Sequence, residues 1–284
     1  MAHSRFVDYQ PTSLQVIYGH STQADPDSIR ADLKVLRPRF DALITYDSVH
    51  GAEVIPEIAA SLGFRAVIIG VWNPFNAAEV DAALAAARNS PKVVVGLSLG
   101  NEMLFFHRHE TRDLVKLLDD IHARAPQLPL STTEQFHMFA RPELRPVLER
   151  LDFLLANVHP IFQPWFHTAT NGDSVRFVLN VVTQLGQEYC GPIVVKETGI
   201  PTAPEKKGFS ERRQAEFYTE LAGRFTDSPE RALAYFAAFD APWRLQDTGP
   251  AAAQGPAPEE AHWGLYDEKR QPKAVVASIK PLGH

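Results

Sequence analysis

Two glutamates directly follow strand-like segments of similar composition. Glu102 comes after the run VVVGLSLGN at positions 93–101, and Glu197 comes after the run PIVVK at positions 192–196. Near-continuous apolar runs of this kind are typical of parallel strands that are buried on both faces. Carboxylates at the ends of two such strands are suited to the work of a proton donor and a nucleophile at a glycosidic bond.

Cleavage of a glycosidic bond needs two carboxyl groups in different protonation states. One donates a proton to the leaving oxygen, while the other stays ionised and meets the developing oxocarbenium ion. We assign Glu102 as the acid/base and Glu197 as the nucleophile, and we expect Asn101 to bond the 2-hydroxyl of the sugar. Either glutamate alone would be better explained as a strand cap or a salt-bridge partner; the pair on matching strands favours catalysis.

Strand-like and helix-like segments alternate along the whole chain, which is the pattern of a parallel sheet. Strands are predicted at 6–10, 42–47, 65–72, 93–101, 128–133, 152–159, 193–197 and 233–240. Helices are predicted at 27–36, 52–62, 76–89, 111–123, 142–150, 174–188, 210–226 and 272–279.

Eight such units in 284 residues fit a single (β/α)8 barrel, which we expect to span 1–284 as one α/β domain. Glu102 then ends the fourth strand and Glu197 the seventh, so both would lie on the C-terminal rim, where barrel enzymes keep their catalytic groups. Segment 14–18 is also strand-like and could be a hairpin at the rim or the true first strand. Segment 248–260 is rich in Pro, Ala and Gly, which predicts a loop.

The composition excludes several classes of function. A net charge of −6 argues against a nucleic-acid partner, and a single cysteine, Cys190, excludes an internal disulfide. His107 and His109 lack the spacing and third ligand of a zinc site, and the glycines form no phosphate-binding motif, so we expect neither metal nor cofactor. No apolar stretch approaches the ~20 residues of a membrane span, and the first residues lack a signal-peptide core. The chain is therefore cytoplasmic, already processed or cut from a larger protein.

Several short motifs resemble glycoside hydrolase family 17, the family of β-1,3-glucanases and β-1,3-glucanosyltransferases, and its bacterial members in particular. They are VDYQP (7–11), IRADL (29–33), TY (45–46), LGNE (99–102), ETG (197–199), AFD (238–240) and WGLYD (263–267). The resemblance implies a retaining barrel enzyme with its acid on strand four, its nucleophile on strand seven and a β-1,3-glucan substrate. It also implies a periplasmic or extracellular location, in some relatives as a domain of a larger membrane protein of glucan synthesis.

The chain departs from the family pattern at three positions. Ile200 stands where the family commonly has Trp, and Ala237 and Ala241 stand where bacterial relatives often have acidic residues. These changes bear on the shape of the sugar subsites and leave the two glutamates in place.

Further residues at predicted strand ends could contact sugar, because sugar rings stack on aromatic side chains and their hydroxyls need polar partners. The candidates are Tyr9, Tyr46, Trp72, Glu134, His159, Trp165 and Trp243. For the aromatic residues the alternative is packing, and for Glu134 it is a salt bridge. Tyr46 also matches a family motif, and we expect it to contact the sugar or the nucleophile.

The sequence thus predicts double displacement on β-1,3-glucan, ending in hydrolysis or in transglycosylation, with or without branching. The two carboxyl groups of a retaining pair lie ~5–5.5 Å apart. One alternative keeps the mechanism on another glycan, such as mannan or cellulose. The other is a sugar-binding barrel without turnover.

Overall fold

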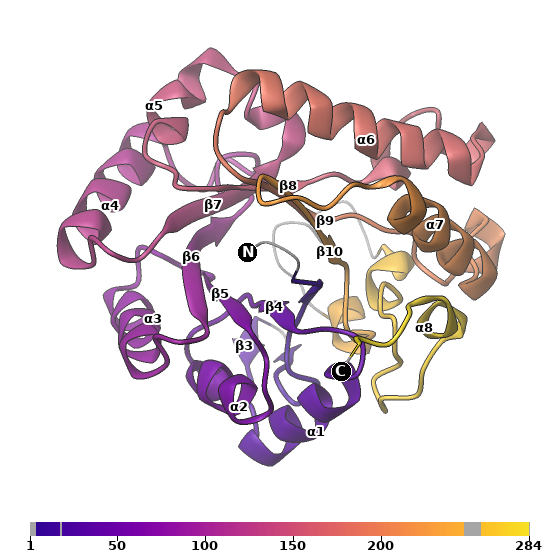
Figure 1. Cartoon of the computed structure of the whole chain (residues 1–284), viewed down its shortest axis with the longest axis horizontal. Helices are drawn as coiled ribbons and strands as arrows, with labels where there is room; N and C mark the ends of the chain where they lie inside the picture. Colours follow the sequence, from indigo (N-terminus) through magenta and orange to yellow (C-terminus); the bar gives the residue numbers. More distant parts are fainter. Residues whose placement is uncertain (1–3, 18, 247–256, 284) are drawn as a thin grey trace.

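Eight parallel strands close into one barrel in the computed structural model, which describes residues 4–17, 19–246 and 257–283 (Figure 1). The barrel strands are β1 (Phe6–Asp8), β4 (Ala42–Ile44), β5 (Ala66–Val71), β6 (Val94–Asn101), β7 (Leu130–Gln135), β8 (Leu154–Asn157), β9 (Ile193–Glu197) and β10 (Arg231–Tyr235). Each strand pairs with its neighbours along the chain, and β1 closes the ring by pairing with both β4 and β10. The predicted (β/α)8 barrel is confirmed, with Glu102 directly after the fourth strand and Glu197 at the end of the seventh.

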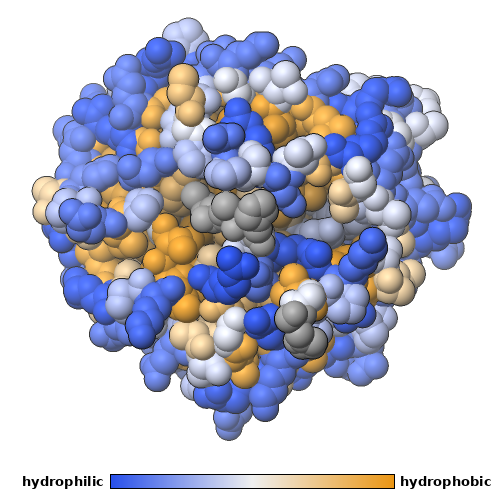
Figure 2. All heavy atoms as spheres, viewed as in Figure 1, coloured by the Kyte–Doolittle hydropathy of each residue, from blue (hydrophilic) through white to orange (hydrophobic). Residues whose placement is uncertain are grey.

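Helices surround the barrel (Figure 1). The α-helices are α1 (Pro26–Leu36), α2 (Ile55–Ser61), α3 (Ala77–Asn89), α4 (Thr111–Arg124), α5 (Arg145–Leu148), α6 (Asn171–Glu188), α7 (Glu211–Arg224) and α8 (Ala274–Ser278). Short 3₁₀ helices are η1 (Ala52–Val54), η2 (Phe136–Met138), η3 (Pro142–Leu144), η4 (Pro160–Phe162), η5 (Phe166–Thr168), η6 (Glu205–Lys207), η7 (Pro242–Leu245) and η9 (Pro258–Ala261). In the view of Figure 2, polar residues cover most of the periphery and apolar residues gather inside it.

Local sequence explains several of the boundaries. The Asp25 side chain accepts a hydrogen bond from the backbone N–H of Ser28 and so caps α1. The helix predicted at 142–150 is split into η3 and α5, with a proline in the first turn of each; Pro146 has no N–H to continue the preceding turn. No helix of the described residues is long and apolar enough to cross a membrane.

The described part of the ambiguous segment, 14–17, leads into a hairpin and is not the first barrel strand. β2 (Val16–Ile17) pairs with β3 (His20–Ser21) in a separate antiparallel sheet, and the hairpin contacts η7. Of the loop predicted at 248–260, positions 248–256 lie outside the described residues, and η9 occupies most of the remainder.

The barrel interior is filled by its own apolar cluster. Its members are Phe6, Ala42, Ile44, Ala66, Ile68, Phe153, Leu155, Val194, Ala232 and Ala234. A larger cluster packs between the sheet and the helices. Gly96 makes room for the interior, because a Cβ there would lie 2.7 Å from Cε1 of Phe153.

The two strands that carry the glutamates each have one extra residue relative to a neighbour. On β6 the pairing moves from Ser98–Ser131 to Asn101–Thr133, and on β9 it moves from Ala156–Val195 to Asn157–Glu197. Such irregularities re-aim side chains and are over-represented beside active sites. Here they precede both predicted catalytic residues.

Candidate active site

Glu197 is buried at the end of β9 and is surrounded by hydrogen-bond donors. The Tyr46 hydroxyl donates to its Oε1 at 2.9 Å, and the Lys196 ammonium lies 3.3 Å from the same atom. Nε2 of His159 lies 3.4 Å from Oε2. Three elements, β9 and the ends of β4 and β8, therefore hold this carboxylate in one orientation.

Glu102 is partly exposed and is held from the side of β7 and β8. Its Oε1 accepts hydrogen bonds from Nε2 of Gln135 at 2.5 Å and from Nδ2 of Asn157 at 2.8 Å. Its backbone has a φ of 53°, in the left-handed region that residues other than glycine seldom adopt. Such strain costs on the order of 1–3 kcal/mol and clusters at functional sites.

The two carboxyl groups have pKa values displaced in opposite directions. Burial raises the pKa of Glu102, and the negative charge of Glu197 raises it further. Burial alone would raise the pKa of Glu197 too, but the Lys196 ammonium and the hydrogen bonds from His159 and Tyr46 outweigh it and lower that pKa to about 2. Opposite displacement of this kind lets one carboxyl hold a proton while its neighbour stays ionised.

Of the predicted sugar contacts, Tyr46 and His159 are brought to Glu197. The His159 ring also lies against the indole of Trp263, with their ring centroids 5.2 Å apart. Asn101, which directly precedes Glu102, is linked to Glu197 through Lys196. The Asn101 side chain accepts a hydrogen bond from Lys196, which in turn contacts Glu197.

Glu134 lies beneath the loop that follows Glu102. Its carboxylate accepts hydrogen bonds from the backbone N–H groups of Leu104 at 2.8 Å and Phe105 at 3.1 Å. The side chain is fully buried, and burial raises its pKa to about 7. The structure thus places Glu134 where it can hold the backbone of the acid-bearing loop.

The tryptophans lie at three different places on the rim. Trp72 is 44 % exposed, and the Arg108 guanidinium lies over its ring at 5.6 Å. Trp243 lines a cavity of about 290 Å³ together with Tyr46 and Trp263. Trp165 is half-buried and packs edge-on against Phe177 of α6.

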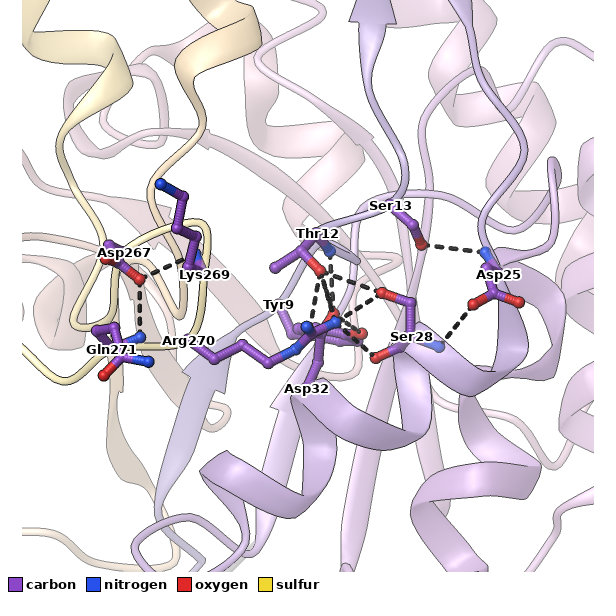
Figure 3. Close-up of polar contacts among 10 residues, drawn as sticks. All are labelled: Tyr9, Thr12, Ser13, Asp25, Ser28, Asp32, Asp267, Lys269, Arg270 and Gln271. Carbon is purple, nitrogen blue, oxygen red and sulfur yellow. Dashed lines mark hydrogen bonds and ion pairs between the residues drawn. The ribbon is translucent and has the colours of Figure 1, made fainter.

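Tyr9 is not brought to the glutamates. It is fully buried, and its hydroxyl donates to Oδ2 of Asp32 at 2.9 Å, in a network with Thr12, Ser28 and Arg270 (Figure 3). Arg270 reaches this network from the C-terminal part of the chain and joins it to α1. The position suits a structural contact between distant segments.

Several residues at the site were missed from the sequence. Lys196 and Asp8 are charged residues inside strand-like runs, and both are fully buried near Glu197. A charge in an apolar run is a usable signal, because burying it is costly unless it is paired. Gln135 and Asn157 gave no comparable signal, and Trp263 was noted only as part of the WGLYD motif.

Comparisons with known proteins identify the family of the chain. A family model described as the BtgE/BtgC glycoside hydrolase domain matches residues 7–264. A glucan 1,3-beta-glucosidase of Arthroderma benhamiae is 25% identical over 269 residues, which cover 88% of this chain and 84% of that protein.

Solved structures show the same fold. A glycoside hydrolase family 17 β-1,3-glucanosyltransferase from Rhizomucor miehei superposes with a TM-score of 0.72 at 22% identity, over 96% of both chains. A GH2 β-galacturonidase from Eisenbergiella tayi superposes with a TM-score of 0.73 at 13% identity, over 98% of this chain and 50% of that one.

Proposed function

Because the chain belongs to the family of the BtgE/BtgC glycoside hydrolase domain, we propose that it is a retaining glycosidase that acts on β-1,3-glucan by double displacement. The observation that carries the proposal is the placement of two carboxyl groups at the ends of strands of one barrel, Glu102 after the fourth and Glu197 at the end of the seventh. The opposite displacement of their pKa values supports it. The names of the Arthroderma and Rhizomucor relatives support β-1,3-glucan as the substrate.

In the first step, the ionised Glu197 attacks the anomeric carbon and forms an ester with it. The bond from that carbon to the leaving oxygen breaks, and Glu102 gives its proton to that oxygen. The hydrogen bond from Tyr46 and the charge of Lys196 keep Glu197 ionised for the attack. Asn101 bonds the 2-hydroxyl of the sugar, a contact that strengthens in the transition state.

In the second step, Glu102, now a carboxylate, takes a proton from the acceptor as the acceptor oxygen attacks the anomeric carbon and the ester breaks. Water as the acceptor gives hydrolysis. A sugar hydroxyl gives transglycosylation, and a hydroxyl within a chain gives a branch. The balance between them depends on how well the acceptor side holds sugar.

The aromatic residues of the rim are assigned by their neighbouring strand or by the cavity that they line. Trp72 follows β5, next to β6 and Glu102, and so belongs to the side of the leaving group and acceptor. Trp243 lines the cavity that contains Tyr46, on the side of the sugar that reacts with Glu197. We assign His159 and Trp165 to further sugar contacts and Glu134 to holding the acid loop; Tyr9 takes no part.

The proposal extends to the type and setting of the enzyme. The motifs that resemble bacterial family 17 support a bacterial type, a periplasmic or extracellular location and an origin as a domain of a larger membrane protein. Fractionation of the native source, with detection of the full-length protein, tests the setting.

The decisive experiment is incubation with laminari-oligosaccharides, with the products separated by size and linkage. Shorter products show hydrolysis, and longer or branched ones show transfer. Glu197→Gln should abolish both while the fold persists. Product formation from cellulose or mannan alone would move the proposal to another glycan, and no turnover of any of the three would refute it.

A further inference from the structure

Lys196 is the extra residue of β9 at the pairing irregularity, and it lies in the floor of the active site. Its side chain is almost completely buried, with 1% of the residue exposed. A buried ammonium group is costly unless its N–H groups are satisfied. It donates to Oδ1 of Asn101 at 2.9 Å, contacts Oε1 of Glu197 at 3.3 Å and lies over the ring of Tyr46 at 4.1 Å.

The contact with Asn101 fixes which way that side-chain amide faces. An ammonium group only donates hydrogen bonds, so the amide must turn its carbonyl oxygen toward Lys196. The NH₂ group at the other end of the planar amide then faces away from the floor. Asn101 is partly exposed, and its NH₂ group has no hydrogen-bond partner among the residues that the structure describes. A free donor is therefore left for a ligand beside Glu102.

We propose that Lys196 is a positioning residue, which turns the NH₂ group of Asn101 toward the 2-hydroxyl oxygen of the reacting sugar. Through its own contact with Oε1, Lys196 also links Asn101 to the nucleophile Glu197. The inference rests on the proposed glycosidase function. With a residue at position 196 that cannot donate a hydrogen bond, the amide would be free to turn its oxygen to the sugar. The preference for a sugar that carries a 2-hydroxyl would then fall.

The charges around Lys196 support a second effect. Five titratable groups among the described residues surround this floor: Asp8 of β1, Tyr46 after β4, Glu102 after β6, His159 after β8 and Glu197 of β9. Arg244 of η7 acts on Tyr46. Lys196 is the strongest of the influences that lower the pKa of Glu197. Burial raises the pKa of Asp8, so this carboxyl competes less for the ammonium. Removing the ammonium should therefore raise the pKa of Glu197.

The test uses two activated aryl β-glucosides, one with its 2-hydroxyl and one with hydrogen in its place. The measured quantity is kcat/KM for the glucoside with its 2-hydroxyl divided by kcat/KM for the one without it. Effects common to both substrates cancel in this ratio. Loss of one hydrogen bond between neutral groups corresponds to about 2- to 12-fold in the ratio. We expect the ratio of Asn101→Ala and that of Lys196→Met to fall by such a factor, and Lys196→Arg to keep most of it. Of these three variants, only Lys196→Met should move the acidic limb of the kcat/KM profile to higher pH.

Lys273 provides a matched control, because it is also a buried lysine paired with a carboxylate, Asp240 at 2.6 Å. Lys273→Met should lose stability without a change in the substrate ratio. If Lys196→Met does not fold, Lys196→Gln, which can still donate to Asn101 but has no charge, should keep the ratio and shift the acidic limb.

The failures can be told apart. No turnover of either glucoside or of laminarin by the wild type refutes the proposed function. Given wild-type turnover, an unchanged substrate ratio in folded Lys196→Met overturns the positioning of Asn101. An unchanged acidic limb in folded Lys196→Met or Lys196→Gln overturns the effect of the ammonium on Glu197.

Discussion

Replacing Tyr46 by phenylalanine should weaken the ionised form of Glu197 while leaving the barrel intact. The substitution removes a 2.9 Å hydrogen bond to Oε1 and keeps the aromatic ring that lies under the Lys196 ammonium. A hydrogen bond to a charged group contributes about 1.5–3 kcal/mol, and a tenfold change in acidity corresponds to about 1.4 kcal/mol. Loss of this bond should therefore raise the pKa of Glu197 from about 2 to between about 3 and 4.

The assay is kcat/KM as a function of pH on an activated aryl glucoside, followed into the acidic range in which the protein remains folded. The nucleophile must be ionised, so activity is lost as the pH falls through its pKa. The wild type should keep its activity to lower pH than Tyr46→Phe. At neutral pH the variant should also be slower, because the carboxylate loses one of the contacts that orient it.

A second tyrosine separates this effect from loss of a buried hydroxyl. Tyr189 donates to the carbonyl oxygen of Leu151 at 2.7 Å and lies before β9, at the other end of the strand from Glu197. Tyr189→Phe should lower the free energy of unfolding by about 1 kcal/mol and leave the pH profile unchanged. Coincident acidic limbs in Tyr46→Phe and the wild type would refute the reasoning, as would the same shift in both variants.

Three further predictions concern the surroundings of the site. Because the pKa of Glu134 is raised to about 7 from 4.5, the folded state holds this proton more tightly, and stability should fall between these pH values as the pH rises; chemical denaturation of Glu134→Gln should show a smaller fall. Arg270→Met leaves the carboxylate of Asp32 buried without its ion-pair partner, so the free energy of unfolding in urea should fall by about 3 kcal/mol (Figure 3). Trp72→Ala should lower the ratio of transfer to hydrolysis products while the hydrolysis of an activated glucoside persists, and an unchanged ratio would remove Trp72 from the acceptor side.

The sequence was sufficient for the architecture, because each unit of the barrel is encoded locally. Apolar runs, cap residues and the alternation of strands and helices predict the eight units, and their order places Glu102 and Glu197 on one rim. Strand ends were predicted too long, at 10 for β1 and at 47 for β4, because each ladder is followed by a buried tyrosine, Tyr9 or Tyr46, whose type is common in strands.

The alternation of side chains along β1 explains why Tyr9, predicted as a sugar contact, lies away from the glutamates. Phe6 belongs to the cluster inside the barrel, whereas Val7 and Tyr9 belong to the cluster under the helices. Successive side chains of a strand point to opposite faces, so Asp8 shares the inner face with Phe6. The same rule places Tyr9 outside, where its hydroxyl meets Asp32. Once the structure shows that Phe6 lies on the inner face, this alternation selects Asp8 over Tyr9 as the residue near the nucleophile.

The same alternation also explains why the site could not be built from the sequence alone. Asn101 and Glu102 are adjacent, as are Lys196 and Glu197, and a regular strand would point the members of each pair in opposite directions. The extra residue in β9 and the left-handed backbone of Glu102 remove this constraint. The extra residues of β6 and β9 are defined by pairing with β7 and β8 and not by local composition. The sequence marks only the extra residue of β6, by a glycine at position 100, which adopts the left-handed conformation in the structure. The contact between Lys196 and Asn101 therefore depends on two strand registers at once, which is why a lysine in an apolar run does not reveal its partner.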